Sequence, residues 1–203
     1  MTPTAMTNAT GADLHAFIRY RFGMGDRLYA VVDAARDKGP VLAARDRCGR
    51  TPRWLFEDAA AAHMSEVAPY LIDVDFRTKY PYPGSDYLDL WAEHLGRSAG
   101  ILLITPAETD ALLGHLRGLF HVTDEEDHKY FLRFYDPRVL RVFLPTCTAA
   151  QAREFFGPIR RILVESERQR MMLSCAPDLS GVRIDERPLQ SNGTPRRTGG
   201  ASQ

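Results

Sequence analysis

Cysteine is scarce in this sequence, and neither sign of charge is in excess. The 203 residues include three cysteines, Cys48, Cys147 and Cys175, without Cys-x-x-Cys spacing. This number and spacing indicate neither a disulfide framework nor a zinc site. The 26 basic and 26 acidic residues give a net charge of +0. Because proteins whose main partner is nucleic acid usually carry a basic surplus, the balance argues against that class.

Long hydrophobic runs and familiar catalytic motifs are absent as well. The longest apolar run, residues 99–105, is too short to cross a bilayer. Residues 1–11 have neither the basic start nor the apolar centre of a signal peptide. The sequence has no phosphate-binding loop, no nucleophile elbow and no zinc-binding His-Glu-x-x-His helix. We therefore expect a cytoplasmic protein that is not an enzyme, needs no metal or cofactor and does not bind a membrane.

The composition is that of a globular protein with one domain. Hydrophobic residues make up 44% of the chain and charged residues 26%, and this length can bury a real core. The end of the chain is rich in proline, glycine, serine and arginine and poor in large apolar side chains, so it has little surface to bury. We expect a flexible N-terminus at 1–11, a folded domain at 12–175 and a disordered tail at 176–203.

Helix and strand signals alternate along the expected domain. Residues 105–108 and 148–151 have the pattern of a helix capping box, and Gly157 followed by Pro158 would end the second of these helices. Six short apolar segments are typical of strands: residues 28–33, 53–56, 70–74, 100–104, 120–123 and 129–135. This alternation predicts the α/β class, with a mixed sheet flanked by helices in a single domain.

Residues 131–140 carry the densest pattern in the chain. An aromatic, strand-like run places Arg133 among apolar side chains, where a guanidinium needs a partner because an unpaired buried charge is costly. Arg133 is therefore either paired with a carboxylate inside the fold or part of a recognition surface. Asp136 can cap a new helix with Pro137 at its first position. Arg138, on the first turn, should be more exposed.

Asp33 closes an apolar strand candidate, a position where active-site carboxylates often lie in α/β folds. It can equally pair with an arginine such as Arg133, or cap the turn that follows. An exposed aromatic loop at residues 80–84 contains Tyr80 and Tyr82 and is either a rigid connection or a partner contact, since tyrosines in such loops suit interfaces.

Residues 131–140 resemble the signature of the adaptor-chaperone domain of bacterial type VI secretion. Further similar pieces precede it in the right order, at residues 28–34, 54–56, 68–72 and 115–117, so the resemblance covers about residues 28–159. Members of that family load toxic effectors onto the spike protein VgrG. Many of them have a further folded region at the C-terminus, where we expect only a short tail here.

The resemblance implies an adaptor that binds two proteins, the N-terminal region of an effector and a VgrG-type spike protein. Tyr80, Tyr82 and Arg138 are the candidates for partner binding. Six further residues form the signature and are expected to hold the structure: Asp33, Arg117, Arg133, Tyr135, Asp136 and Pro137. Two alternatives are a small α/β enzyme, in which Asp33, Arg133 and Asp136 would converge on a deep polar cleft, and a plain structural or regulatory protein.

Overall fold

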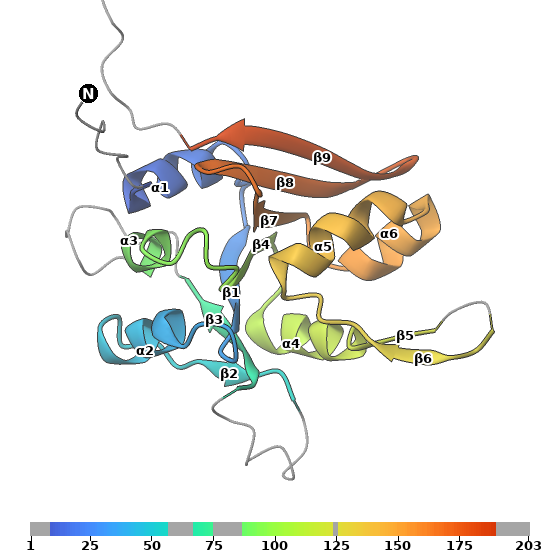
Figure 1. The fold of residues 1–203 in the computed structure, drawn as a ribbon, viewed down its shortest axis with the longest axis horizontal. Helices are drawn as coiled ribbons and strands as arrows, with labels where there is room; N and C mark the ends of the chain where they lie inside the picture. Colours follow the sequence, from blue (N-terminus) through green and yellow to red (C-terminus); the bar gives the residue numbers. More distant parts are fainter. Residues whose placement is uncertain (1–8, 57–66, 75–86, 124–125, 190–203) are drawn as a thin grey trace, which may run out of the picture.

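A seven-stranded sheet runs through the centre of the protein (Figure 1). The computed structural model describes residues 9–56, 67–74, 87–123 and 126–189. The strand order is β2-β3-β1-β4-β7-β8-β9, and every described pairing in it is antiparallel. The strands are β1 Arg27–Asp33, β2 Arg53–Trp54, β3 Pro69–Asp73, β4 Gly100–Thr105, β7 Arg161–Glu165, β8 Met171–Asp178 and β9 Gly181–Pro188.

Helices cover both faces of the sheet, which confirms the α/β class (Figure 1). One layer contains α1 Gly11–Arg19, α2 Gly39–Asp46 and α3 Tyr87–Ala92. The other contains α4 Thr109–Gly118, α5 Pro137–Phe143, a 3-10 turn at Leu144–Thr146, and α6 Ala149–Phe156. A separate ribbon of β5 His121–Thr123 and β6 Lys129–Phe131 projects beyond α4. None of the described helices is long and apolar enough to cross a membrane.

Alternate residues of β1 face two hydrophobic cores. Tyr29 and Val31 pack with side chains from α4, α5 and α6. Leu28, Ala30 and Val32 pack with side chains from α1, α2 and α3. Since successive side chains of a strand point to opposite faces, a strand buried on both sides reads as a continuous apolar run, which is what β1 and β4 show.

The two predicted capping boxes have different outcomes. Thr148 and Gln151 form the expected box at the start of α6, and Gly157 ends that helix with a φ of 49°. The box at Thr105 is wrong. Thr105 is instead the last residue of β4, and its Oγ1 donates to Pro158 O at 2.8 Å. Because pairing in the sheet holds the backbone of Thr105 extended, α4 begins only at Thr109.

The strand predicted over residues 129–135 ends at Phe131. Leu132 N still donates to Phe120 O at 2.8 Å, and the chain then turns. The turn places Phe134 and Tyr135 in the core beside α4 and leaves Arg133 on the surface. Burial of the two rings therefore replaces strand pairing as the force that fixes this segment.

The prediction of a disordered tail from residue 176 is wrong for residues 176–189, which are folded. Strands β8 and β9 pair over eight residues each, and Leu189 is buried. Most side chains of β9 are polar, so composition gave no sign that its backbone pairs along its whole length. Residues 190–203 lie outside the described part of the chain.

The N-terminal boundary is also earlier than predicted. Thr10 and Asp13 form a capping box for α1, and Gly11 is already buried in the helix. Residues 1–8 of the predicted flexible segment lie outside the described residues.

Candidate functional site

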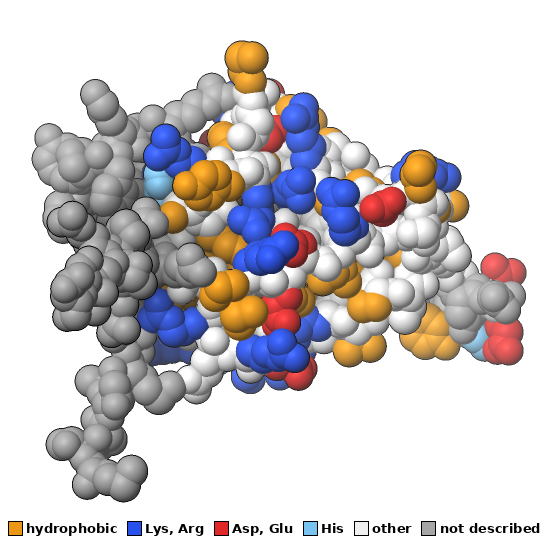
Figure 2. Space-filling view, turned by 90° about the horizontal axis from the view of Figure 1, so that it is seen from above, with side chains coloured by type: hydrophobic (Ala, Val, Ile, Leu, Met, Phe, Trp, Pro, Cys, Tyr) orange, Lys and Arg blue, Asp and Glu red, His pale blue; other side chains and the backbone are white. Residues whose placement is uncertain are grey.

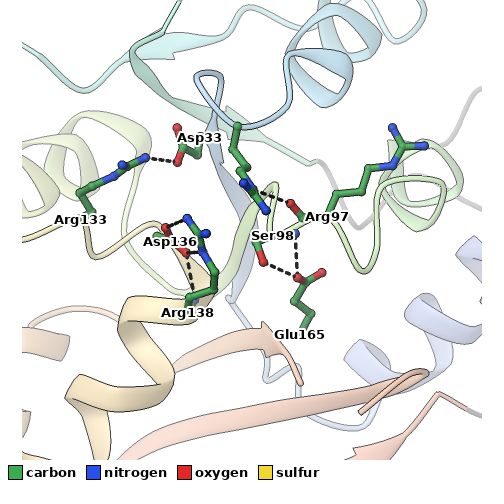
Figure 3. A network of polar contacts seen from close by, with 8 residues as sticks. Asp33, Arg97, Ser98, Arg133, Asp136, Arg138 and Glu165 are labelled. Carbon is green, nitrogen blue, oxygen red and sulfur yellow. Dashed lines mark hydrogen bonds and ion pairs between the residues drawn. The ribbon is translucent and has the colours of Figure 1, made fainter. Parts of the chain in front are cut away.

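Asp33 lies at the point where β1 leaves the sheet (Figure 3). Its backbone N–H donates to Ala99 O at 2.8 Å, and its carbonyl accepts from Arg36 N and Asp37 N in the turn that follows. Its side chain is only 1% exposed. The strand and the turn therefore hold a carboxylate inside the protein, where it needs a cationic partner.

Arg133 supplies that partner from the turn after β6. Its Nη2 lies 2.6 Å from Asp33 Oδ2, while its own side chain is 43% exposed (Figure 3). Burial lowers the pKa of Arg133, but the charge and the hydrogen bond of Asp33 outweigh burial, so that the pKa is raised. The predicted pairing of Arg133 with a carboxylate is confirmed. The expectation that Arg133 is itself buried is wrong, because the turn brings its guanidinium over Asp33 from outside.

Asp136 forms a second pair beside the first. As predicted, it caps α5 with Pro137 at the first position, and its Oδ1 accepts from Arg138 N at 2.9 Å. Arg138 Nε and Nη2 also donate to this carboxylate, at 3.0 and 2.6 Å. Burial alone would raise the pKa of Asp136, but the bonds from Arg138 outweigh it and the pKa is lowered. The Asp136 side chain is 3% exposed and that of Arg138 47%.

A third carboxylate fixes the loop before β4. Glu165, at the end of β7, accepts from Ser98 N at 2.8 Å and Ser98 Oγ at 3.0 Å (Figure 3). It also accepts from Gly96 N at 2.8 Å. Ser98 has a φ of 54°, which is uncommon for a residue with a side chain. Arg36 Nε donates to Arg97 O in the same loop at 3.1 Å. This clamp could not be predicted from the sequence, because Glu165 and Ser98 are 67 residues apart and form no local motif.

An open apolar groove lies beside the second pair. It has a volume of about 660 Å³ and is lined by Leu132, Asp136, Arg138, Val139, Val142, Phe143 and Thr146. Val142 is 73% exposed, so α5 presents an apolar side chain to solvent at this place. A groove with an apolar floor and a cationic edge can hold an apolar protein segment that also carries an acidic group.

The other predicted residues have mainly structural surroundings. Arg117 donates from Nε to Leu55 O at 3.2 Å and from Nη2 to Trp54 O at 3.4 Å, which ties α4 to the end of β2. Tyr135 is buried, and burial raises the pKa of its hydroxyl. Tyr80 and Tyr82 lie outside the described residues, so their predicted role stays a prediction.

The carboxylates named in the enzyme alternative do not face a common cleft. Asp33 and Asp136 are each almost fully buried, and each is held by its own arginine. Among the described residues, no group of three His, Cys, Asp or Glu side chains could hold a metal ion. The three cysteines are free, and burial raises the pKa of Cys175 to about 12. None of these features adds support to the enzyme alternative.

The part of the sequence that forms this site matches a known family. The family model described as a domain of unknown function (DUF4123) matches residues 28–154. The chain belongs to this family. No curated protein and no solved structure gives a match. The region that matches the DUF4123 family begins in β1 and ends in α6, so it includes both arginine–aspartate pairs and the groove. Strands β7, β8 and β9 follow it.

Proposed function

We propose that this DUF4123 protein is a cytoplasmic adaptor for type VI secretion, which binds a toxic effector and recruits it to a VgrG-type spike protein. The proposal rests on the resemblance of residues 131–140 and of the segments before them to that adaptor family. The main structural observation in its support is the apolar groove on α5, which adjoins this signature. An adaptor of this kind acts by binding alone and needs no cofactor.

The groove has the features of a contact for a helix or an extended segment. Val139 and Val142 are among its apolar lining residues, and Arg138 lines it as well. In such contacts a few apolar anchors supply most of the binding energy, and charged groups at the rim select the partner. We assign the groove to one of the two partners and the loop with Tyr80 and Tyr82 to the other.

The two ion pairs, Asp33 with Arg133 and Asp136 with Arg138, hold the backbone next to this surface in place. Asp136 fixes the first turn of α5, and Asp33 fixes the turn that contains Arg133. Because both carboxylates are buried, the two arginines are held in place by their inner hydrogen bonds while their outer sides face solvent. Arg138, which lines the groove, can therefore meet an acidic group of the partner.

Co-purification tests the proposal. The tagged protein is expressed with the VgrG-type spike protein and the effector encoded beside it, each singly and then together, at low salt. We expect capture of both partners. Val142→Glu should weaken capture of one partner, because it places a charge on the apolar floor of the groove. Leu42→Glu is the matched control, since Leu42 is 44% exposed in α2, in the helix layer on the opposite face of the sheet.

Failure to capture either partner would contradict the adaptor function. Equal loss of capture in Val142→Glu and Leu42→Glu, with both variants folded, would remove the groove from the interface. In that case, the pair Tyr80→Ala and Tyr82→Ala shows whether the loop contributes instead, since tyrosine anchors can each contribute about 2 kcal/mol to binding.

A further inference from the structure

Strand β9 forms one edge of the sheet, beyond the region that matches the family. It pairs with β8 in the register Met172↔Arg187, Ser174↔Asp185 and Ala176↔Arg183. Since side chains alternate along a strand, Arg183, Asp185 and Arg187 form a row on one face, the face of the sheet that carries α1. Both arginines are exposed.

Two further arginines adjoin this row on the same face. Arg161, in β7, lies 3.4 Å from Ser174 Oγ through Nη1, and Arg21, just after α1, lies 3.8 Å from Asp185 Oδ2. Arg187 Nε also approaches Asp185, at 2.9 Å. Seen from above, Lys and Arg side chains gather in the middle of the molecule with fewer acidic ones among them (Figure 2). Arg21 and Arg187 thus contact Asp185, Arg161 lies beside Ser174, the β8 partner of Asp185, and Arg183 lies 3.9 Å from Asp178 at the end of β8.

The surroundings of Arg21 show that these charges oppose each other. Burial lowers the pKa of Arg21, Asp185 raises it, and the charges of Arg161 and Arg187 lower it further. The net charge of the chain is +0, so this surplus of positive charge is local. Added carboxylates would reduce the repulsion between the arginines.

The backbone of β9 offers a second kind of contact. Its eight residues pair on one side with β8, and no strand among the described residues pairs with its outer edge. An open edge presents N–H and C=O groups that a strand of another chain can use. The two ends of this chain do not match the charge of the row: residues 1–8 contain no charged side chain, and residues 190–203 contain two arginines and no acid.

We propose that the edge of β9 binds an extended acidic segment of a partner protein as an added strand. Carboxylates four positions apart on the added strand would face Arg183 and Arg187, which lie about 13 Å apart along β9 at the usual rise of a strand. The backbone of the segment pairs with β9. This inference is independent of the proposed function, since it requires neither an effector nor a spike protein.

The mixed row favours a protein segment over a polyphosphate or a membrane. Asp185 lies between Arg183 and Arg187 along β9. A continuous line of phosphates that contacted both arginines would therefore also be repelled by Asp185. Only a polypeptide can form the backbone ladder with the strand edge. Charged side chains on an edge strand also disfavour pairing with hydrophobic strands of other proteins. The same row therefore selects an acidic segment over a hydrophobic one.

The probe is a fluorescent peptide of about ten residues with valine and threonine at the other positions and glutamates four positions apart on one face. The expected result is saturable binding, with binding about tenfold or more weaker when both glutamates are replaced by glutamine or lysine. Arg183→Glu with Arg187→Glu should cause a similar loss, and Arg183→Gln with Arg187→Gln a smaller one. The charge-matched control, Arg45→Glu in α2 with Arg47→Glu directly after it, should bind like the wild type.

Methylation of alternate peptide amides tests strand addition on the wild-type protein. One alternate set points toward β9 and the other away, so one methylated peptide should lose binding and the other keep it. Hydrogen exchange over residues 181–188 should slow when the unmodified peptide binds. The proposal would be overturned by an absence of binding or by equal binding of the lysine peptide. It would also be overturned by full binding to the β9 variants or by equal effects of the two methylated sets. So would tighter binding of a thymidine oligonucleotide or of phosphatidylglycerol vesicles at the same arginines.

Discussion

The arginines beside β1 and those beside β9 differ in the number and the burial of the carboxylates that they contact. Near β1, Asp33 and Asp136 are buried, and each has its own arginine. Near β9, two guanidinium groups, those of Arg21 and Arg187, lie near Asp185, which is itself partly exposed, and Arg183 lies near Asp178, which is also partly exposed. A buried carboxylate makes its arginine part of the fold, because loss of the cation leaves a charge that water cannot reach. An exposed surplus of arginine adds little to stability and is available to a partner.

The largest expected difference between the two regions is in the loss of stability when a glycine of each is replaced by alanine. A Cβ on Gly100 would lie 2.0 Å from Val31 O, inside the central pair of β1 and β4. A Cβ on Gly181 would lie 2.5 Å from Cys147 O, at the β8–β9 turn. Gly100→Ala should lower the free energy of unfolding by about 3 kcal/mol or more, and Gly181→Ala by less, since the turn lies at the edge of the sheet.

Urea unfolding followed by circular dichroism measures both values. If Gly100→Ala were as stable as the wild type, the close approach of β4 to β1 at this residue would be contradicted. If Gly181→Ala were the more damaging change, the β8–β9 hairpin would be more important to the fold than the centre of the sheet.

The next difference concerns single arginines. Arg133→Ala should lower the free energy of unfolding by about 2 kcal/mol, because it leaves Asp33 buried and unpaired. We expect less than the 3–5 kcal/mol typical of a fully buried pair, since the guanidinium is partly exposed. Arg183→Ala is the matched control: its ion pair with Asp178, at 3.9 Å, lies at the surface, and the change should cost less than about 0.5 kcal/mol. Equal stability of the two variants would remove the contrast between the regions.

The smallest expected effect is a dependence on pH. The pKa of Asp136 is lower in the folded protein than in the unfolded chain, where it is about 3.9. Its contribution to stability is therefore complete above the unfolded pKa and is lost as the pH falls through the folded one. Arg138→Ala should cost at most about 1 kcal/mol at pH 7, and its difference from the wild type should shrink in acid. A difference that stays constant from neutral to acidic pH would contradict the role of Arg138.

Local chemistry made parts of this structure predictable. Asp136 and Pro137 begin α5 as expected, because capping depends on neighbouring residues. The apolar runs of β1 and β4 were recognisable because they are buried on both faces. The pairing of Asp33 with Arg133 was one of three alternatives for Asp33, since the sequence shows that a charge needs a partner but not which one lies near.

Strand pairing determined what was missed. The side chains of β9 are mostly polar, and the strand forms because β8 offers it a complete edge. Glu165 reaches the loop before β4 only because β7 lies beside β4 in the sheet. The pattern at Thr105 matched a helix start, but the sheet kept that residue in β4. In each case the pairing of strands, neighbouring in sequence for β8 and β9 and distant for β1, β4 and β7, decided the structure.

A double-mutant cycle on Arg133 and Asp33 tests the contrast between the two regions most directly. Urea unfolding is measured for the wild type, Arg133→Ala, Asp33→Asn and the double variant, and the coupling energy is taken from the four values. The account predicts a favourable coupling of about 1–2 kcal/mol, with Arg133→Ala costing much less once Asp33 is neutral. A coupling near zero would contradict the account and would place Arg133, like the arginines of β9, on a surface that serves recognition alone.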